Sequence, residues 1–333
     1  MKDEVYFVLH LEVKMKAAVV LEAGKSPVYS EFEEPIPHED EVCVHITVSA
    51  LTNFTKVRAA GKHFSISTLP PFVVGIDGVG RRDDGSRVYF LFPRVPFGGM
   101  AERTVVRSSQ CIRVPDNVSD VTLAAIADPG MAAWAGLEAR ARLVPGETVL
   151  VNGATGTAGR MAVQIAKHLG AKKVIATGRN PETLHALFAI GADEVIPLDH
   201  DGKTSKDELK KHFEQRIDIV LDYLWGASAE QVLAASSAAK RMMPIRFVQI
   251  GTTSAPNITL SGASLRSSTI QIMGSGIGSI PLEKINLILY KLMQATSEAG
   301  FQIETRELPL SGIAEAWSIE NATPRIVLTM NAP

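Results

Sequence analysis

The segment that most constrains this fold is the run VLVNGATGTAG at residues 149–159. Its first three residues suit a buried parallel strand, and a glycine-rich turn follows them. Behind the turn, apolar residues recur at spacings of three and four, as one helix face requires: Ala158, Met161, Ala162, Ile165, Ala166 and Leu169. A strand, a tight turn and a helix in this order allow the first N–H groups of the helix to hold a pyrophosphate. The segment therefore predicts a dinucleotide site and, with it, hydride transfer.

The glycines of this turn have separate tasks in that interpretation. Gly156 and Gly159 stand where a dinucleotide fold needs a close backbone approach, whereas Ala154 replaces the first glycine of G-x-G-x-x-G and Gly153 supplies the turn. An ordinary tight turn is the alternative, and the strand before and helix after favour the phosphate cradle. The predicted cofactor contacts here are Asn152, Gly153, Ala154, Thr155, Gly156, Thr157, Ala158 and Gly159.

The next predicted strand ends in TGR at residues 177–179. An acidic residue at this place would bind the ribose of NAD, and none is present. Gly178 leaves room and the Arg179 guanidinium can bind a phosphate, so the sequence favours NADPH. The alternative is an arginine in solvent. Further cofactor contacts are expected at the ends of this and later strands, at Thr177, Gly178, Arg179, Ile250, Gly251 and Gly276.

Length and composition restrict the protein class. A chain of 333 residues exceeds the usual size of one core and indicates two domains. A net charge of −2 gives no reason to expect RNA or DNA binding. Cys43 and Cys111 are the only cysteines, which is typical of a reducing compartment, and we expect a cytoplasmic protein. No apolar run is long enough to span a bilayer, and residues 1–14 look like an extension or an upstream-start artefact without a secretory signal.

The distribution of patterns along the chain predicts two architectures. The part from residue 15 to 127 is rich in short β-type runs, predicted at 17–21, 41–48, 87–92 and 103–106. Two helices are expected around Pro129, at 121–127 and 132–139. Strands then alternate with helices, which indicates a doubly wound parallel sheet. These strands are predicted at 149–151, 173–177, 194–197, 217–221, 245–250 and 268–273, with helices at 181–190, 206–215 and 228–239.

By its motifs, the chain resembles the zinc-free quinone oxidoreductase branch of the medium-chain dehydrogenase/reductase superfamily. The resemblance covers nearly all of residues 15–330 and rests on MKAA (15–18), VGIDGVG (74–80), RVY (87–89), GGMAE (98–102), GETVLVNGATG (146–156) and GAD (191–193). It implies an α/β protein with a GroES-like β-rich catalytic domain at 15–127 and 278–333 and a Rossmann NADP-binding domain at 128–277. It also implies a nicotinamide in the cleft between them and a homodimer formed through the edge strand at 269–273.

The same resemblance implies that there is no metal in the site. Zinc members of the superfamily carry Gly-His-Glu where this chain reads Gly75-Ile76-Asp77, and a cysteine near the position of Thr52 or Asn53. Both ligand types are missing. Without a Lewis acid to polarise an alcoholate, hydride donation to an electron-poor acceptor is the easier chemistry. Quinones and alkenes conjugated to a carbonyl are such acceptors.

Two residues are candidates for catalytic roles. Relatives place an asparagine near the nicotinamide, and Asn53 matches it by type, with Thr52 as the rival match and a plain turn as the alternative. Tyr89 is a candidate proton donor, or else a packed strand tyrosine. Four further apolar residues are expected to line a pocket, with a place in the core as the alternative: Phe92, Phe97, Met131 and Trp134.

These observations predict a zinc-independent, NADPH-dependent reductase of quinones or of alkenes conjugated to a carbonyl. Three other functions stay open at this point. They are a zinc-free alcohol dehydrogenase, an enoyl-thioester reductase, and a protein that binds NADPH without turnover.

Overall fold

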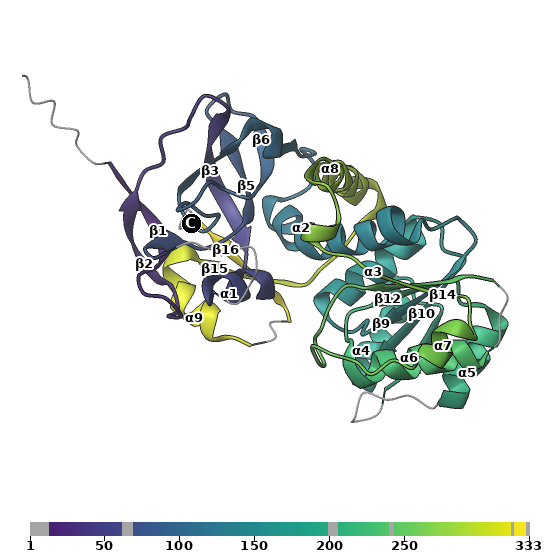
Figure 1. Cartoon of the computed structure of the whole chain (residues 1–333). Helices are drawn as coiled ribbons and strands as arrows, with labels where there is room; N and C mark the ends of the chain where they lie inside the picture. The colour runs from purple at the N-terminus through teal and green to yellow at the C-terminus, as the bar shows by residue number, and fades with distance from the viewer. Residues whose placement is uncertain (1–12, 62–68, 199–205, 240–242, 321–322, 331–333) are drawn as a thin grey trace, which may run out of the picture. The chain divides into compact units, whose positions relative to one another are not determined.

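The computed structural model describes residues 13–61, 69–198, 206–239, 243–320 and 323–330. It divides into two compact units, each with its own core (Figure 1). The β-rich unit comprises Met1–Ala124 and Thr305–Pro333, and the parallel-sheet unit comprises Ala125–Glu304. No helix in the described part of the chain is both long enough and apolar enough to cross a membrane.

The β-rich unit contains two mainly antiparallel sheets (Figure 1). The larger has the order β15-β16-β3-β5-β6-β8, with β7 also paired to β3, and the smaller has the order β2-β1-β4. The strand bounds are β1 Lys14–Val20, β2 Val28–Glu33, β3 Glu41–Ala50, β4 Phe72–Val73, β5 Asp77–Arg82, β6 Arg87–Leu91, β7 Arg103–Arg107, β8 Cys111–Arg113, β15 Thr305–Pro309 and β16 Arg325–Thr329. The four strands predicted for this part of the chain are present, with bounds shifted by up to three residues. Residues 1–12, most of the predicted extension, lie outside the described residues.

Strand β5 was not predicted, because its sequence DGVGRR contains two glycines that lower strand propensity. The structure explains both. A Cβ on Gly78 would lie 2.8 Å from the carbonyl oxygen of Val48 on β3. A Cβ on Gly80 would lie 2.3 Å from the carbonyl oxygen of His45 on β3, so the two strands meet too closely there for a side chain. Tertiary packing thus overrides local preference at this strand.

The parallel-sheet unit is a six-stranded sheet of order β11-β10-β9-β12-β13-β14, with every pair parallel. This confirms the predicted doubly wound sheet. The strand order reverses beside β9, where dinucleotides bind in such sheets. The bounds are β9 Thr148–Asn152, β10 Lys173–Gly178, β11 Glu194–Pro197, β12 Ile219–Asp222, β13 Ile245–Gln249, β14 Ile270–Gly274, α3 Thr157–His168, α4 Pro181–His185, α5 Lys206–Arg216, α6 Gly226–Ala238 and α7 Gly262–Arg266.

The prediction of two helices around Pro129 is wrong. A single helix, α2 (Asp120–Trp134), runs through the proline and continues as the π-helical stretch η2 (Ala135–Ala141). Apolar side chains on both sides of the proline are fully buried, and their packing keeps the helix continuous: Leu123, Ala124, Ala125, Ile126, Ala127 and Ala133.

Helix α8 (Leu282–Ala299) belongs to the parallel-sheet unit, whereas the sequence placed it in the β-rich domain from residue 278 onward. It packs so closely on α2 that a Cβ on Gly130 would lie 2.6 Å from Cδ2 of Leu292. It is also held by Glu138 of η2, whose carboxylate accepts hydrogen bonds from Lys284 (2.8 Å) and Lys291 (2.9 Å). The chain therefore returns to the β-rich unit at Thr305.

Glu138 provides a pH-dependent contribution to stability. Burial raises its pKa, but hydrogen bonds from Lys284, Trp134 and Lys291 outweigh this and bring the pKa to about 2. A folded-state pKa below the ordinary value of 4.5 gives stability that is present above pH 4.5 and is lost as the pH falls toward 2. We expect E138Q to lower the free energy of unfolding at pH 7 by about 1–3 kcal/mol.

Urea unfolding of E138Q and wild type across the acid range tests this expectation. The difference between the two proteins should shrink as the pH falls below 4.5. Glu283 on the same helix as the two lysines is exposed, so E283Q serves as the control and should behave as wild type. A constant difference between E138Q and wild type across this whole range would show that the charge of Glu138 is not the cause.

Candidate active site

The glycine-rich turn after β9 has the geometry that the sequence predicted for it. Gly153 has φ +87°, a left-handed conformation that glycine adopts without strain. Its N–H donates to Oγ1 of Thr177 (3.0 Å), and the N–H of Ala154 donates to the carbonyl oxygen of Thr177 (2.8 Å). The turn is thus fixed to the end of the neighbouring strand β10.

The two later glycines differ in what surrounds them. A Cβ on Gly159 would lie 2.4 Å from the carbonyl oxygen of Gly153, so α3 and the turn are in backbone contact. A Cβ on Gly156, by contrast, would meet no atom within 4 Å. Gly156 caps α3, whose first N–H groups have no partners within the helix. An open glycine beside such N–H groups fits a bound pyrophosphate.

A buried network supports this turn from below. Asn152 is completely buried; its Nδ2 donates to Oδ1 of Asp222 (2.7 Å), and its Oδ1 accepts from Thr177 (2.8 Å) and Ser228 (3.0 Å). The side chains of Asn152, Ala154 and Thr177 are all enclosed by protein. The structure therefore places them as supports of the turn, and their assignment as cofactor contacts stays a prediction.

Sequence reasoning missed Ser228 and Asp222 of this network, and Asp222 has further partners. Its carboxylate also accepts hydrogen bonds from the backbone N–H groups of Leu224 (3.3 Å) and Trp225 (3.0 Å). Trp225 has φ +59°, a conformation that favours glycine, and the carboxylate holds it there. Burial raises the pKa of Asp222 to about 6, against the lowering effect of its hydrogen bonds. The available signal was that the neighbouring strands β9 and β12 both end in a polar residue.

Arg179 directly follows β10 and is exposed. Gly178 before it packs on the turn, since a Cβ there would lie 2.3 Å from Cγ2 of Thr155. Asn180 after it caps α4 by accepting from the N–H of Thr183 (3.0 Å). Within the described ranges the Arg179 guanidinium makes no hydrogen bond or ion pair, so it is available to a ligand.

The remaining predicted contacts lie at the carboxyl ends of β13 and β14, on the same edge of the sheet. The N–H groups of Ile250 (2.8 Å) and Gly251 (3.1 Å) donate to the carbonyl oxygen of Asp222. Gly276 follows β14, and its N–H donates to Oγ of Ser279 (2.9 Å). The structure brings these residues to the predicted edge, and their contact with a cofactor stays a prediction.

The two predicted catalytic residues are in the β-rich unit and differ in exposure. Asn53 is exposed at the first position of helix α1 (Asn53–Ala59), which Thr52 caps by accepting from the N–H of Thr55 (2.9 Å). Tyr89 is 1% exposed, and its hydroxyl donates to Oδ2 of the buried Asp77 (2.7 Å). This geometry favours the alternative of a packed strand tyrosine, and the roles of both residues in catalysis stay predictions.

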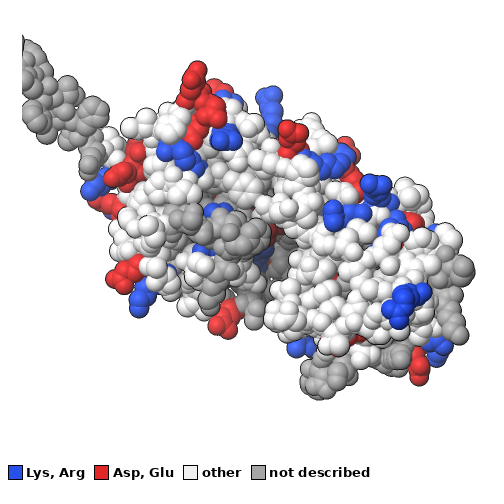
Figure 2. Space-filling view, viewed as in Figure 1, with Lys and Arg blue, Asp and Glu red and all other residues white. Residues whose placement is uncertain are grey.

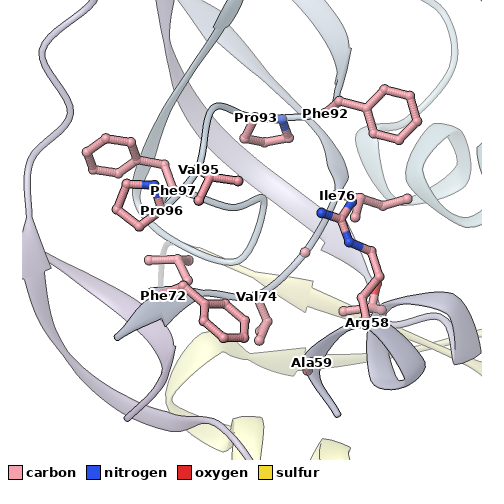
Figure 3. Close-up of a pocket in the computed structure, with 13 residues that line it drawn as sticks. Arg58, Ala59, Phe72, Val74, Ile76, Phe92, Pro93, Val95, Pro96 and Phe97 are labelled. Carbon is pink, nitrogen blue, oxygen red and sulfur yellow. The ribbon is translucent and has the colours of Figure 1, made fainter. Parts of the chain in front are cut away.

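The β-rich unit also contains a pocket lined mainly by apolar side chains (Figure 3). Its walls come from α1, from the segment Phe72–Ile76 and from the loop that begins at Phe92. Phe92 and Phe97 line it, as predicted, whereas Met131 and Trp134 are not among its lining residues. The lining residues are Thr55, Arg58, Ala59, Phe72, Val73, Val74, Gly75, Ile76, Phe92, Pro93, Val95, Pro96 and Phe97.

Potential metal ligands do gather at one place in the described part of the β-rich unit. Cys43 and His45 on β3 lie beside Asp83, with one ligand atom of each within 4.8 Å of the others, and His45 Nε2 is 2.9 Å from Asp83 Oδ1. None of the three lines the pocket. Ile76, at the position of the zinc-ligating histidine in the resemblance, is a pocket residue without a ligand atom.

Comparisons with known proteins agree with this architecture. The family model for zinc-binding dehydrogenases matches residues 158–291. A probable NADPH-dependent quinone reductase of Emericella nidulans is 24% identical over 89% of this chain and 94% of its own length. The quinone oxidoreductase of Homo sapiens is 27% identical over 77% of this chain and 82% of its own length. The solved structure of the Thermus thermophilus quinone oxidoreductase, described also in complex with NADPH, is 24% identical and superposes with a TM-score of 0.78, covering 95% of this chain and all of the other; this likeness shows the fold.

In its family-model match and its named relatives, the chain is similar to the medium-chain dehydrogenase/reductase superfamily of oxidoreductases, and among these to the quinone oxidoreductase-like branch. The predicted fold, a β-rich GroES-like unit with a Rossmann sheet, is confirmed.

Proposed function

We propose that this protein is an NADPH-dependent reductase that transfers hydride to quinones or to alkenes conjugated to a carbonyl. One observation carries the proposal. An open glycine at the start of α3 lies in the same unit as an exposed arginine at the end of the next strand, and that arginine is without a partner among the described residues. The names of the fungal and human relatives support the same chemistry.

In this proposal the first N–H groups of α3 bind the pyrophosphate, and Arg179 binds the 2′-phosphate. Gly159 and the Asn152–Asp222 network hold the turn in position, so binding needs little rearrangement of the backbone. When bound, NADPH supplies a hydride from C4 of its nicotinamide. On the face seen in Figure 2, acidic and basic side chains are mixed and form no large basic patch of the kind that binds a nucleic acid.

The apolar pocket of the β-rich unit is the proposed acceptor site. Its aromatic and proline side chains offer apolar surface, which suits a planar, electron-poor acceptor. Asn53 is retained as a proposed contact to the reacting groups, since its side chain is exposed at the start of α1. The proton that completes the reduction comes from water or from Tyr89, and the engagement of Tyr89 with Asp77 favours water.

We further propose that the reaction needs no zinc, because the pocket holds Ile76 where a ligating histidine would stand. NADPH oxidation with a panel of quinones, conjugated ketones and enoyl thioesters tests both proposals. We expect turnover of quinones and ketones that is unchanged after treatment with a strong chelator. Faster turnover of the thioesters would favour an enoyl-thioester reductase. Turnover of simple alcohols with NADP⁺ would favour an alcohol dehydrogenase. Binding of NADPH without any turnover would favour a non-catalytic NADPH-binding protein.

Assembly and location are also proposals. Strand β14 lies at an edge of the parallel sheet and carries the partly exposed Ile272, which supports a homodimer formed through this edge. Cys43 and Cys111 are free thiols, consistent with a reducing cytoplasm. Sedimentation of the purified protein at micromolar concentration would reveal a monomer if the proposed edge pairing is wrong.

A further inference from the structure

Among the described residues, Arg58 is the only charged one that lines the pocket. It rises from α1, and its guanidinium lies beside Ile76, opposite the loop that carries Pro93 and Phe97 (Figure 3). Thr55, the other polar side chain of the wall, is fully buried, and its hydroxyl is 3.0 Å from that of Thr52. The guanidinium is thus the pocket's main polar feature.

This guanidinium has no counter-charge in the described part of the chain. It makes no ion pair and no hydrogen bond there, and its Cζ lies over the Phe54 ring, 6.0 Å from the ring centre. Burial lowers the pKa of Arg58, with no opposing contribution from a carboxylate. Lys56 on the same helix differs, since its Nζ donates to the carbonyl oxygens of Trp317 (2.9 Å) and Ile319 (2.6 Å).

A partly desolvated cation without a partner lowers stability, because it loses hydration and gains no Coulomb energy in return. Binding an anion removes this cost and adds charge-assisted hydrogen bonds. A single guanidinium matches the single charge and the two oxygens of a carboxylate. A phosphate dianion would need further cations, and the described residues of the pocket wall include none. The rest of the wall suits an apolar ligand body.

We propose that the pocket selects an apolar acceptor that bears a carboxylate, and that Arg58 pairs with this carboxylate. That the ligand accepts hydride rests on the proposed reductase function, whereas its negative charge is inferred from the pocket alone. It makes Arg58 a specificity-determining residue, whose loss affects acidic acceptors and spares neutral ones of the same shape.

A matched pair of conjugated ketones tests the proposal, 3-benzoylacrylate and its methyl ester, with NADPH as the reductant. Wild type should reduce the acid with a kcat/KM about 10- to 100-fold above that of the ester. R58M should lose this preference because its kcat/KM for the acid falls while that for the ester stays unchanged, and R58K should retain part of the preference. Arg107 in the same unit is exposed and pairs with Asp40, so R107M is the control and should behave as wild type.

Calorimetric titration with 4-phenylbutanoate, which cannot be reduced, measures the anion site without the cofactor. Wild type and R107M should bind it, R58M should not, and R58M should melt at the wild-type temperature or above because an uncompensated charge is gone. If no acceptor is reduced but this ligand binds through Arg58, the reductase function fails and the anion site stands. Equal rates for acid and ester in wild type, or an equal loss of both in R58M, would overturn the proposal.

Discussion

Gly159→Ala is expected to lower the free energy of unfolding by about 1–3 kcal/mol and to abolish NADPH binding. The added Cβ would lie 2.4 Å from the carbonyl oxygen of Gly153 and 2.5 Å from Cα of Ala154. Both atoms belong to backbone that is itself tied to Thr177, so neither moves without breaking the turn. The helix must shift away from the turn, and its first N–H groups then no longer converge on one point. Urea unfolding and NADPH fluorescence titration measure the two effects.

Gly156→Ala is the matched substitution three residues earlier. Its Cβ would meet no protein atom within 4 Å, and its φ of −77° suits any residue. Stability should therefore stay within about 0.5 kcal/mol of wild type. NADPH affinity should nevertheless fall about tenfold or more, because the methyl group occupies the space where the pyrophosphate approaches the backbone. A folded G156A protein with wild-type affinity would show that the pyrophosphate does not lie there.

Arg179→Gln is expected to weaken NADPH binding about 10- to 100-fold and to leave NADH binding unchanged. The guanidinium is exposed, follows β10 and makes no ion pair within the described residues, so its removal costs the protein little. Charge-assisted hydrogen bonds to a phosphate contribute about 1.5–3 kcal/mol, which corresponds to that range of affinity. Dissociation constants of both cofactors, measured by fluorescence at one fixed salt concentration, give the ratio.

Arg266 supplies the control for this prediction, since it is exposed on α7 of the same unit. R266Q should keep the wild-type preference for NADPH, which separates a local contact from a general effect of charge. Equal weakening of NADPH and NADH binding in R179Q would place the arginine elsewhere on the cofactor. No weakening at all would support the alternative of an arginine in solvent.

The parallel-sheet unit could be predicted closely from the sequence because its signals are local. A short apolar strand, a glycine turn and a periodic helix are each encoded within a short stretch of chain, and the alternation repeats. The helix pair around Pro129 was mispredicted because its continuity depends on burial against distant segments such as Leu292. Strand β5 was missed for the same reason, since Gly78 and Gly80 fit close contacts with Val48 and His45 on another strand.

The two candidate sites differ in the same way. Gly156 and Arg179 each come shortly after a predicted strand, so the sequence pattern alone predicts where they lie in the sheet unit. The pocket brings together residues 55–59, 72–76 and 92–97, and only the fold makes them neighbours. The partner of Tyr89, Asp77, lies on another strand, and no spacing in the sequence predicts that contact. The absence of a counter-charge for Arg58 among the described residues is likewise a property of the fold.

The central claim is that hydride passes from NADPH to a conjugated acceptor on this protein. It is tested most directly with NADPH labelled by deuterium on one or the other face of C4, with the methyl ester of 3-benzoylacrylate as acceptor and mass spectrometry of the product. We predict one deuterium on carbon in the reduced ketone from one of the two labelled cofactors, and none from the other. Reduced ketone without deuterium from either cofactor, or no NADPH oxidation at all, would contradict the account.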